Sequence, residues 1–260
     1  MKTYRFHGIV TPEHDALNLV VSTPLDLVNP ETGELEIRGT LEIKNANINV
    51  TFELTRDFDL PSLRNRAEDF VRLFTNMLAY SWGFGYDCEI IGVYDEKGNH
   101  QLLGPSIPVL QASRGERPLT INQLMSIVMT YPLLRLALED MREAMRSPID
   151  TGFRCYRSIE TMRRHFLPAG AEDDGKQKTQ SWVDFRSALN IDRSWIDVVK
   201  PFSDIRRHGG DRSISDSERA NLFVHTWKVA DRFVFLLHEK LKQLPIDRFP
   251  QLQEPARQEV

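Results

Sequence analysis

Residues 35–54, LEIRGTLEIKNANINVTFEL, decide the fold of the N-terminal part of this chain. From Leu35 to Ile43 the apolar side chains stand at odd positions, and from Ile48 to Leu54 they stand at even positions. A period of two is typical of a half-buried strand, and a change of parity requires an interruption. Asn45-Ala46-Asn47 supplies it. We predict two strands joined by a tight turn, with a bulge in one long strand as the alternative, and we expect Gly39 to weaken or bulge the first strand.

The residues on either side of this stretch extend the same pattern. Strand signals occur at residues 4–8 and 17–21, a helix begins near Pro61 and ends at Gly83, and a strand pair spans residues 87–94 and 100–103. Residues 104–118 hold three prolines and no clear period, which indicates a connector. We therefore predict an α+β domain over residues 1–118, with a mixed antiparallel sheet and one or two helices.

The rest of the chain has helical periodicity. Thr120 with Gln123, and Ser215 with Glu218, have the spacing of capping boxes, and Pro132 interrupts the first helical stretch. We predict an all-helical bundle over residues 119–260, with helix from about Thr120 to Leu244.

Its last helix carries apolar residues that step alternately by three and four positions. Such a heptad seam forms either a core stripe or a dimer face, and we expect Trp227 at its centre to be buried. The seam consists of Ala220, Phe223, Trp227, Ala230, Val234, Leu237, Leu241 and Leu244.

Composition and charge narrow the classes of function. The 260 residues are 41% apolar and 27% charged, which is ordinary for a globular protein, and two cysteines cannot form a disulfide framework. The net charge of −4 argues against a general nucleic-acid coat protein. There is neither a signal-peptide h-region nor an apolar run of membrane-spanning length, so we expect a cytoplasmic protein with no membrane partner.

Motifs for metals and nucleotides are missing from the sequence. The seven histidines show no His-x-x-x-His or His-Glu-x-x-His spacing, and no phosphate-binding glycine loop occurs. We therefore expect neither a metal nor a cofactor.

Two polar strings stand out instead. The first, DIRRHGG at residues 204–210, reads as a helix end in which cations suit the helix dipole, or as a site in which His208, Arg207 and Arg206 are catalytic candidates. The second carries the binding candidates Arg157, Glu160 and Arg164 at helical spacing. These three residues form either a line of ion pairs along the helix surface or, if they face residues 204–210, a polar cluster within the bundle. We predict that residues of the two strings lie close enough to form ion pairs.

Together these strings carry a family resemblance. The Tyr-Arg-x-Ile-Glu helix at 156–160, a helix with Trp182, the Arg-His-Gly loop and the final long helix resemble the C-terminal part of bacterial HEPN-like proteins over about residues 150–244. The resemblance implies a helical bundle that commonly dimerises. Many HEPN domains are metal-independent ribonucleases of toxin or phage-defence systems, with four to six residues between an Arg and a following His, and others are inactive binding modules. Arg219 with His225, and Arg232 with His238, have that spacing, whereas His208 does not.

Two hypotheses follow, and the sequence does not decide whether the chain is an enzyme. In the favoured one, the protein is a non-catalytic interaction or sensing module on a HEPN-like bundle, in which the polar strings form a structural network. In the alternative, it binds or cleaves RNA, with His208 as acid or base and the arginines on phosphate. We expect a homo-oligomer in either case.

Overall fold

The change of parity in residues 35–54 marks a β-hairpin in the computed structural model. Strand β3 (Leu35–Lys44) pairs antiparallel with β4 (Asn47–Leu54) without a register shift. Asn45 and Ala46 between them have φ angles of 49° and 62°. Positive φ at both central residues is typical of the tight turns that match strand twist. The predicted hairpin is therefore confirmed, and the alternative of one bulged strand is wrong.

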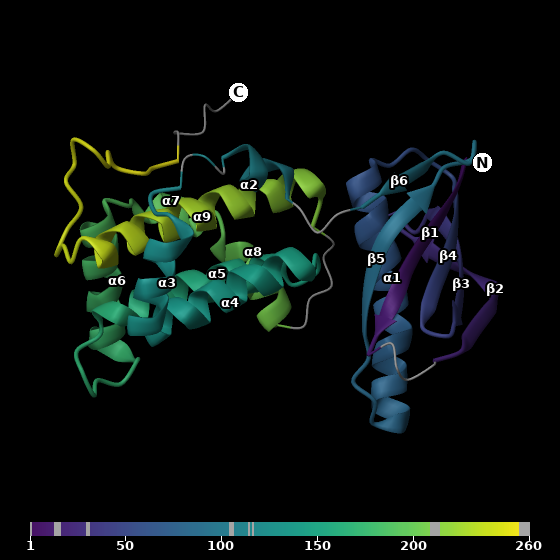
Figure 1. Ribbon diagram of the computed structural model, residues 1–260, viewed down its shortest axis with the longest axis horizontal. Helices are drawn as coiled ribbons and strands as arrows, with labels where there is room; N and C mark the ends of the chain where they lie inside the picture. Colours follow the sequence, from purple (N-terminus) through teal and green to yellow (C-terminus); the bar gives the residue numbers. More distant parts are fainter. Residues whose placement is uncertain are drawn as a thin grey trace. The chain divides into compact units, whose positions relative to one another are not determined.

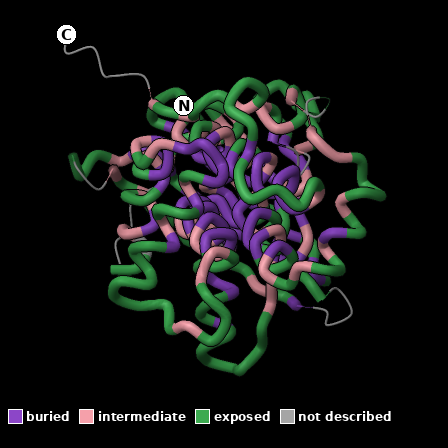
Figure 2. The backbone as a smooth tube through the Cα atoms, turned by 90° about the vertical axis from the view of Figure 1, so that its left-hand side faces the viewer, coloured by how far each residue is buried: buried purple, intermediate pink, exposed green. Residues whose placement is uncertain are grey.

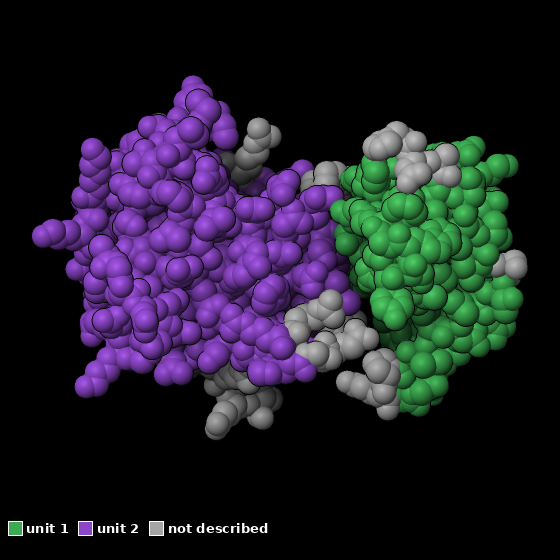
Figure 3. All heavy atoms as spheres, turned by 90° about the horizontal axis from the view of Figure 1, so that it is seen from below, with its two compact units in different colours: residues 1–105 green, residues 106–260 purple. Residues whose placement is uncertain are grey.

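The structure describes residues 2–12, 17–29, 32–103, 107–113, 115, 117–208 and 214–254; the side chains of Ser22 and Arg206 also lie outside the description. The chain forms two units, residues 1–105 and residues 106–260 (Figure 3). Each unit is described by itself below.

The first unit is a six-stranded sheet with a helix on one face (Figure 1). The strand order is β2-β3-β4-β1-β5-β6, and neighbouring strands are antiparallel. The helix starts after Asp59, which accepts a hydrogen bond from the Ser62 N–H, and ends at Gly83 in the left-handed conformation. The remaining elements are β1 (Lys2–Thr11), β2 (Leu19–Val28), α1 (Leu60–Trp82), β5 (Asp87–Tyr94) and β6 (His100–Leu102).

Gly39 in β3 makes room for aromatic packing between the sheet and α1. A Cβ at Gly39 would lie 3.0 Å from a ring carbon of Phe52 and 3.2 Å from one of Phe70. The rings of these two phenylalanines meet edge to face, with centroids 5.7 Å apart. The β3–β4 ladder continues through Gly39. The pairing of β3 with β2 is irregular: its register shifts between Val21 and Leu25, and again between Leu27 and Val28, where the extra residue is Glu36 of β3.

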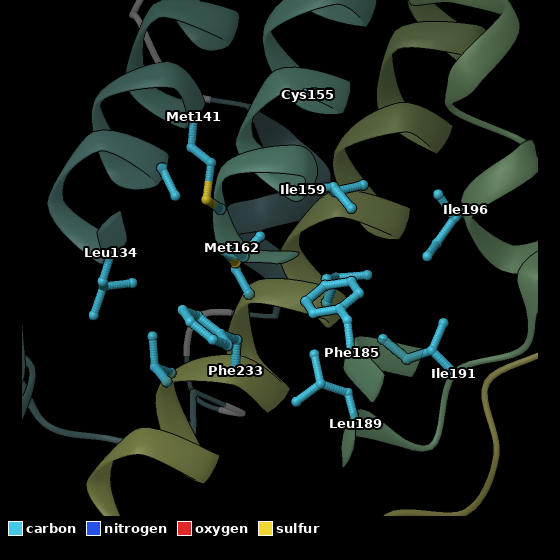
Figure 4. Close-up of a cluster of buried hydrophobic side chains, with 14 of the residues drawn as sticks. Leu134, Met141, Cys155, Ile159, Met162, Phe185, Leu189, Ile191, Ile196 and Phe233 are labelled. Atoms are coloured by element: carbon cyan, nitrogen blue, oxygen red, sulfur yellow. The ribbon is translucent and has the colours of Figure 1, made fainter. Parts of the chain in front are cut away.

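The second unit is helical, as predicted. Over the described parts of residues 150–244 there is no strand, and Ile191 and Leu252 form an isolated bridge. Its buried apolar side chains gather in the centre, with exposed loops around them (Figures 2 and 4). The helices are α2 (Pro108–Ala112), α3 (Ile121–Thr130), α4 (Pro132–Arg146), α5 (Thr151–Arg163), α6 (Gly175–Leu189), α7 (Arg193–Asp197), α8 (Lys200–Arg207) and α9 (Asp216–His238). The α+β fold class is confirmed.

Helix α9 is the core element of this unit. Residues 232–237 are all buried, whichever side of the helix they occupy. Phe223, Ala230, Val234 and Leu237 of the seam therefore pack inside their own unit, as a core stripe does, while Leu241 is exposed and a dimer face stays a prediction. Trp227 lies at the edge of the core and is only half-buried, against expectation. The helix ends at His238, because Lys240 takes a φ of 53° and the Leu241 N–H donates to Leu236 O in a Schellman-type turn.

The helices before α9 are short or begin after a polar loop. Helix α6, which carries Trp182, begins at Gly175. Two short helices, α7 and α8, follow Asp192. Pro201 lies in the first turn of α8, where its missing N–H costs nothing, and so favours a new start there. Both capping boxes are confirmed.

Candidate functional site

Two of the three binding candidates, Arg157 and Glu160, lie in helix α5, the third, Arg164, begins the 3-10 turn that follows it, and each has a different partner. Arg157 pairs with Asp140 of α4, Glu160 pairs with Arg207 of α8, and Arg164 lies near Asp173 in the loop before α6. The row is therefore not a ladder along one helix. It connects α5 to three neighbouring segments of the bundle.

The pair on the α4 side is centred on a buried carboxylate. Asp140 is 3% exposed and accepts hydrogen bonds from Arg157, with Nε 2.8 Å from Oδ2. Arg154 approaches the same carboxylate, with Nη1 3.2 Å from Oδ1. The hydrogen bond to Asp140 raises the pKa of Arg157, so the pair stays charged. Two arginines on one carboxylate hold α4 against α5.

The pair on the α8 side links the two strings. Arg207 donates to Glu160, and its guanidinium carbon lies 5.4 Å from the centre of the Tyr156 ring. Glu160 and Arg207 thus form the predicted ion pair between the two strings. A backbone approach explains it: a Cβ on Gly152 of α5 would lie 2.5 Å from Cβ of Phe202 of α8. The two helices cross closely, so side chains one or two turns away can meet.

The end of α8 behaves as a helix stop. The His208 N–H donates to Asp204 O at 3.1 Å, which continues the helical hydrogen bonds by one residue, and His208 is exposed. The side chain of Arg206, and Gly209 and Gly210, lie outside the described residues. Of the three catalytic candidates, Arg207 is thus the one whose described side chain is placed in an ion pair.

A buried arginine, not predicted as a site residue, fixes the loop before α6. Arg163 is 1% exposed and donates to both oxygens of Asp173, at 2.6 and 2.7 Å, and to Ser181 Oγ at 2.9 Å. The hydrogen bond from Arg163 lowers the pKa of Asp173. The guanidinium also lies over the ring of Trp182, 5.4 Å from its centre. This clamp holds Trp182 beside α5.

Next to that clamp lies a pocket of about 230 Å³ formed by α5, α6, α7 and α8. Tyr156 and Trp182 form part of its wall and stack on each other with centroids 6.3 Å apart and an interplanar angle of 22°. Arg193 in the lining is held by Asp197, with Nε 3.0 Å from Oδ2. The full lining is Tyr156, Thr179, Trp182, Val183, Arg186, Arg193, Ile196, Asp197 and Lys200.

The pocket has an excess of positive charge. Three cations in its lining face one carboxylate, that of Asp197. Within the described part of the chain, neither Arg186 nor Lys200 has an ion-pair partner within 4 Å. Burial raises the pKa of Tyr156 to about 12, and Glu160 adds to this effect, so the phenol keeps its proton at neutral pH. The wall therefore offers cations, a stacked aromatic pair and a phenol donor to a ligand.

The two Arg-x5-His pairs have structural roles. Arg219 is buried and donates to Ala144 O and Met145 O at the end of α4. Arg232 is buried and donates to Leu189 O and Asn190 O, where α6 ends. Each guanidinium thus satisfies carbonyls that a helix C-terminus leaves unpaired.

The histidines of these pairs are also engaged. His225 is buried under Trp195, with ring centroids 4.1 Å apart, and bonds to Asn221 O and to Glu254. His238 Nδ1 lies 3.0 Å from Glu239 Oε1. Neither histidine faces the arginine of its pair in these interactions.

Sequence reasoning missed the parts of this region that come from distant segments. Asp140, Asp173 and Trp182 gave no motif, because their roles depend on how four helices pack. The lining cations Arg186, Arg193 and Lys200 lie on α6, α7 and α8 and meet only in the folded bundle. Among the described residues there is no group of three or more metal-ligating side chains, and no helix long and apolar enough to cross a membrane.

Fold and site together define a two-unit α+β protein whose helical unit has a cationic, aromatic pocket. Two family models match it: residues 4–103 match the N-terminal domain, and residues 120–238 the C-terminal domain, of DUF8168, a domain of unknown function. Both units are thus similar to the two halves of one family. No curated protein and no solved structure matches the chain.

Proposed function

We propose that this chain is a cytoplasmic, non-catalytic sensing module built on a HEPN-like helical bundle, and that it binds a small anionic ligand with a flat apolar part. The single observation that carries the proposal is the pocket at Tyr156 and Trp182, where Arg186 and Lys200 lack ion-pair partners within the described chain. Unpaired cations beside an apolar wall favour a ligand that supplies both negative charge and a ring surface.

The other candidate residues support a non-catalytic role. Arg157 and Arg207 are engaged by Asp140 and Glu160, and the arginines of both Arg-x5-His pairs cap helix ends. If Arg219 or Arg232 turned to a scissile phosphate, Met145 O or Leu189 O would lose its described donor, which costs about 1–3 kcal/mol. The charges of the described cluster thus serve the fold.

A binding experiment with defined probes tests the ligand class. We expect phenyl phosphate to quench Trp182 fluorescence and to bind more tightly than inorganic phosphate, as measured by calorimetry. Arg186→Ala and Lys200→Ala should each weaken binding at least fivefold, while Lys242→Ala, which removes an exposed lysine after α9, should leave it unchanged. Equal affinity in all three variants, or no binding of either probe, would overturn the proposal.

RNA binding is the second candidate, because the same pocket combines cations with stacked aromatic rings. Proteins that bind single-stranded nucleic acid use this combination. Incubation of the protein with mixed RNAs in EDTA distinguishes the two functions. We expect no cleavage. Cleavage that disappears in His208→Ala would establish the nuclease alternative and contradict a non-catalytic module.

A homo-oligomer is still a prediction, and α3 is the described surface on which we would test it. Ile121, Met125 and Met129 are 77%, 63% and 78% exposed and follow one another at intervals of four. Helix α3 contains no charged residue, so two copies could meet there without like-charge repulsion. Light scattering should show a smaller particle for Met125→Lys than for the unaltered protein, and equal masses would exclude this face.

A further inference from the structure

Two histidines converge on the sheet face of the first unit. His7 lies in β1 and His100 in β6, with β5 between these strands. Their Nε2 atoms are 2.8 Å apart, and the ring centroids are 5.0 Å apart. Both rings direct the same nitrogen, Nε2, toward one point, so the two imidazoles face each other across β5.

The backbone between them is built for this approach. Gly92 of β5 pairs with His7, and a Cβ at Gly92 would lie 2.3 Å from His7 Nε2 and 2.8 Å from His100 Nε2. Only glycine leaves the space for the two rings to meet. The turn before β6 is also fixed, because the Asp95 carboxylate accepts hydrogen bonds from the Lys97 and Asn99 N–H groups at 2.9 and 2.8 Å. This turn fixes the start of the strand that carries His100.

We propose that His7 and His100 bind a divalent late transition-metal ion through their Nε2 atoms, with water in the remaining coordination positions. Imidazole nitrogen suits Cu²⁺, Ni²⁺ and Zn²⁺, at about 2.0–2.1 Å from the metal. Tetrahedral geometry at that length needs the nitrogens roughly 3.3 Å apart, so a small separation of the rings admits the ion. A pocket of about 170 Å³ lined by Arg5, Phe6, His7, Asn49 and Tyr94 gives space for bound water.

The surrounding charges define the properties of the site. Arg5 lies 5.8 Å from the centre of the Tyr94 ring on the same side and opposes a bound cation. The ion therefore binds reversibly and in the order of imidazole preference, with Cu²⁺ ahead of Ni²⁺ and Zn²⁺.

Titration of the full chain with CuCl₂, NiCl₂ and MgCl₂ tests the site. Calorimetry at pH 7.5 should give one Cu²⁺ per chain, and electron paramagnetic resonance should show nitrogen ligation. Mg²⁺, which requires oxygen ligands, should not bind. His7→Ala and His100→Ala should each weaken Cu²⁺ binding at least tenfold, whereas His238→Gln, at a surface histidine of the second unit, should not change it.

The opposite pattern would overturn the proposal. If His7→Ala and His100→Ala bind Cu²⁺ as the unaltered protein does, the two imidazoles share a proton and nothing more. Circular dichroism of both variants controls for folding, and His100 is exposed, so its removal leaves no cavity. Gly92→Ala provides a third measure: its methyl group would occupy the place where the two nitrogens meet and should also reduce Cu²⁺ affinity.

Discussion

The two units differ in the charged side chains that they bury. The first unit buries Glu36 and Glu68, which are 3% and 2% exposed. The second unit buries one carboxylate, that of Asp140, but also three arginines, Arg163, Arg219 and Arg232, at 1%, 4% and 7%. The groups that bind these buried charges also differ between the units. Arginine side chains surround each buried glutamate, whereas backbone carbonyls hold two of the three buried arginines.

Backbone hydrogen bonding explains this difference. Inside a sheet, the carbonyls of paired strands are satisfied by the neighbouring strand, so a buried charge must find a side chain. A helical bundle instead buries helix C-termini, each with unpaired carbonyls that need donors. The planar guanidinium has five N–H groups and can serve several carbonyls at once. A buried arginine can therefore stabilise a packed all-helical unit by donating to helix C-terminal carbonyls, a role that the sheet unit does not offer.

The largest effect should come from removing such an arginine. Arg232→Ala leaves Leu189 O and Pro250 O without their donor, removes one of the two donors to Asn190 O, and should reduce the free energy of unfolding by about 3 kcal/mol. Urea denaturation followed by tryptophan fluorescence reports mainly on the second unit, which holds three of the four tryptophans. Burial lowers the pKa of Arg232 to about 10, so the charge is present at neutral pH.

Arg232→Lys is the matched control for this prediction. It keeps a cation but cannot reach three carbonyls with one planar group, so its loss should lie between those of the alanine variant and the unaltered protein. If Arg232→Ala unfolds at the same urea concentration as the unaltered protein, the carbonyls have other donors and the explanation of the comparison fails.

In the first unit, Glu36→Gln should reduce the free energy of unfolding by a smaller amount, about 2 kcal/mol. Its partners Arg56 and Arg66 have side chains that are 56% and 28% exposed, so they can turn to water once the carboxylate is neutral. Hydrogen exchange of β3 and β4 measures the change in this unit. A loss as large as that of Arg232→Ala would show that the sheet unit depends on buried charge as strongly as the bundle does.

The link between α5 and α8 should be weaker still. Glu160 is 17% exposed and Arg207 37%, so a double-mutant cycle with Glu160→Ala and Arg207→Ala should give a coupling of about 0.5–1 kcal/mol. This exceeds what a helix-surface ladder supplies, since it joins two elements. A coupling of zero would place the pair among surface ion pairs with no structural role.

The smallest effect concerns pH. The rings of Tyr131, Phe166 and Phe233 pack against His165, which keeps an exposed side, and desolvation lowers its pKa from the usual 6.5. Below that pH the unfolded chain takes up the proton more readily than the folded one, so stability falls as the solution is acidified. Between pH 7.5 and 5.0, His165→Gln should lose less stability than the unaltered protein. Equal losses would assign the pH dependence to other groups.

Local signals in the sequence predicted most of the fold. The parity change at residues 45–47, the capping boxes at Thr120 and Ser215, and the breaks at Pro132 and Gly83 all depend on neighbouring residues, and all are confirmed. The errors lie where packing decides. Helix α9 ends at His238 through a turn at Lys240 that the heptad pattern does not reveal, and the edge position of Trp227 depends on segments that lie far away in the chain.

The site was less predictable for the same reason. Helical spacing identified Arg157 and Glu160 as a polar row, but not that α4 and α8 supply their partners. The spacing of Arg219 and His225 suggested chemistry, whereas the buried side chains cap a helix and pack under an aromatic ring. The pair of His7 and His100 is separated by 93 positions, so no spacing rule could find it.

The close crossing at Gly152 has a consequence for sequence variation. A Cβ there would meet Phe202, including its backbone carbonyl at 3.0 Å, so the neighbour cannot move aside by changing a rotamer. Any substitution would push α8 away from α5 and separate Arg207 from Glu160. In a library of single variants selected for folding, position 152 should return glycine alone, whereas exposed positions such as Met125 and Met129 should accept many residues. Variation along this chain is thus limited more by backbone proximity than by charge.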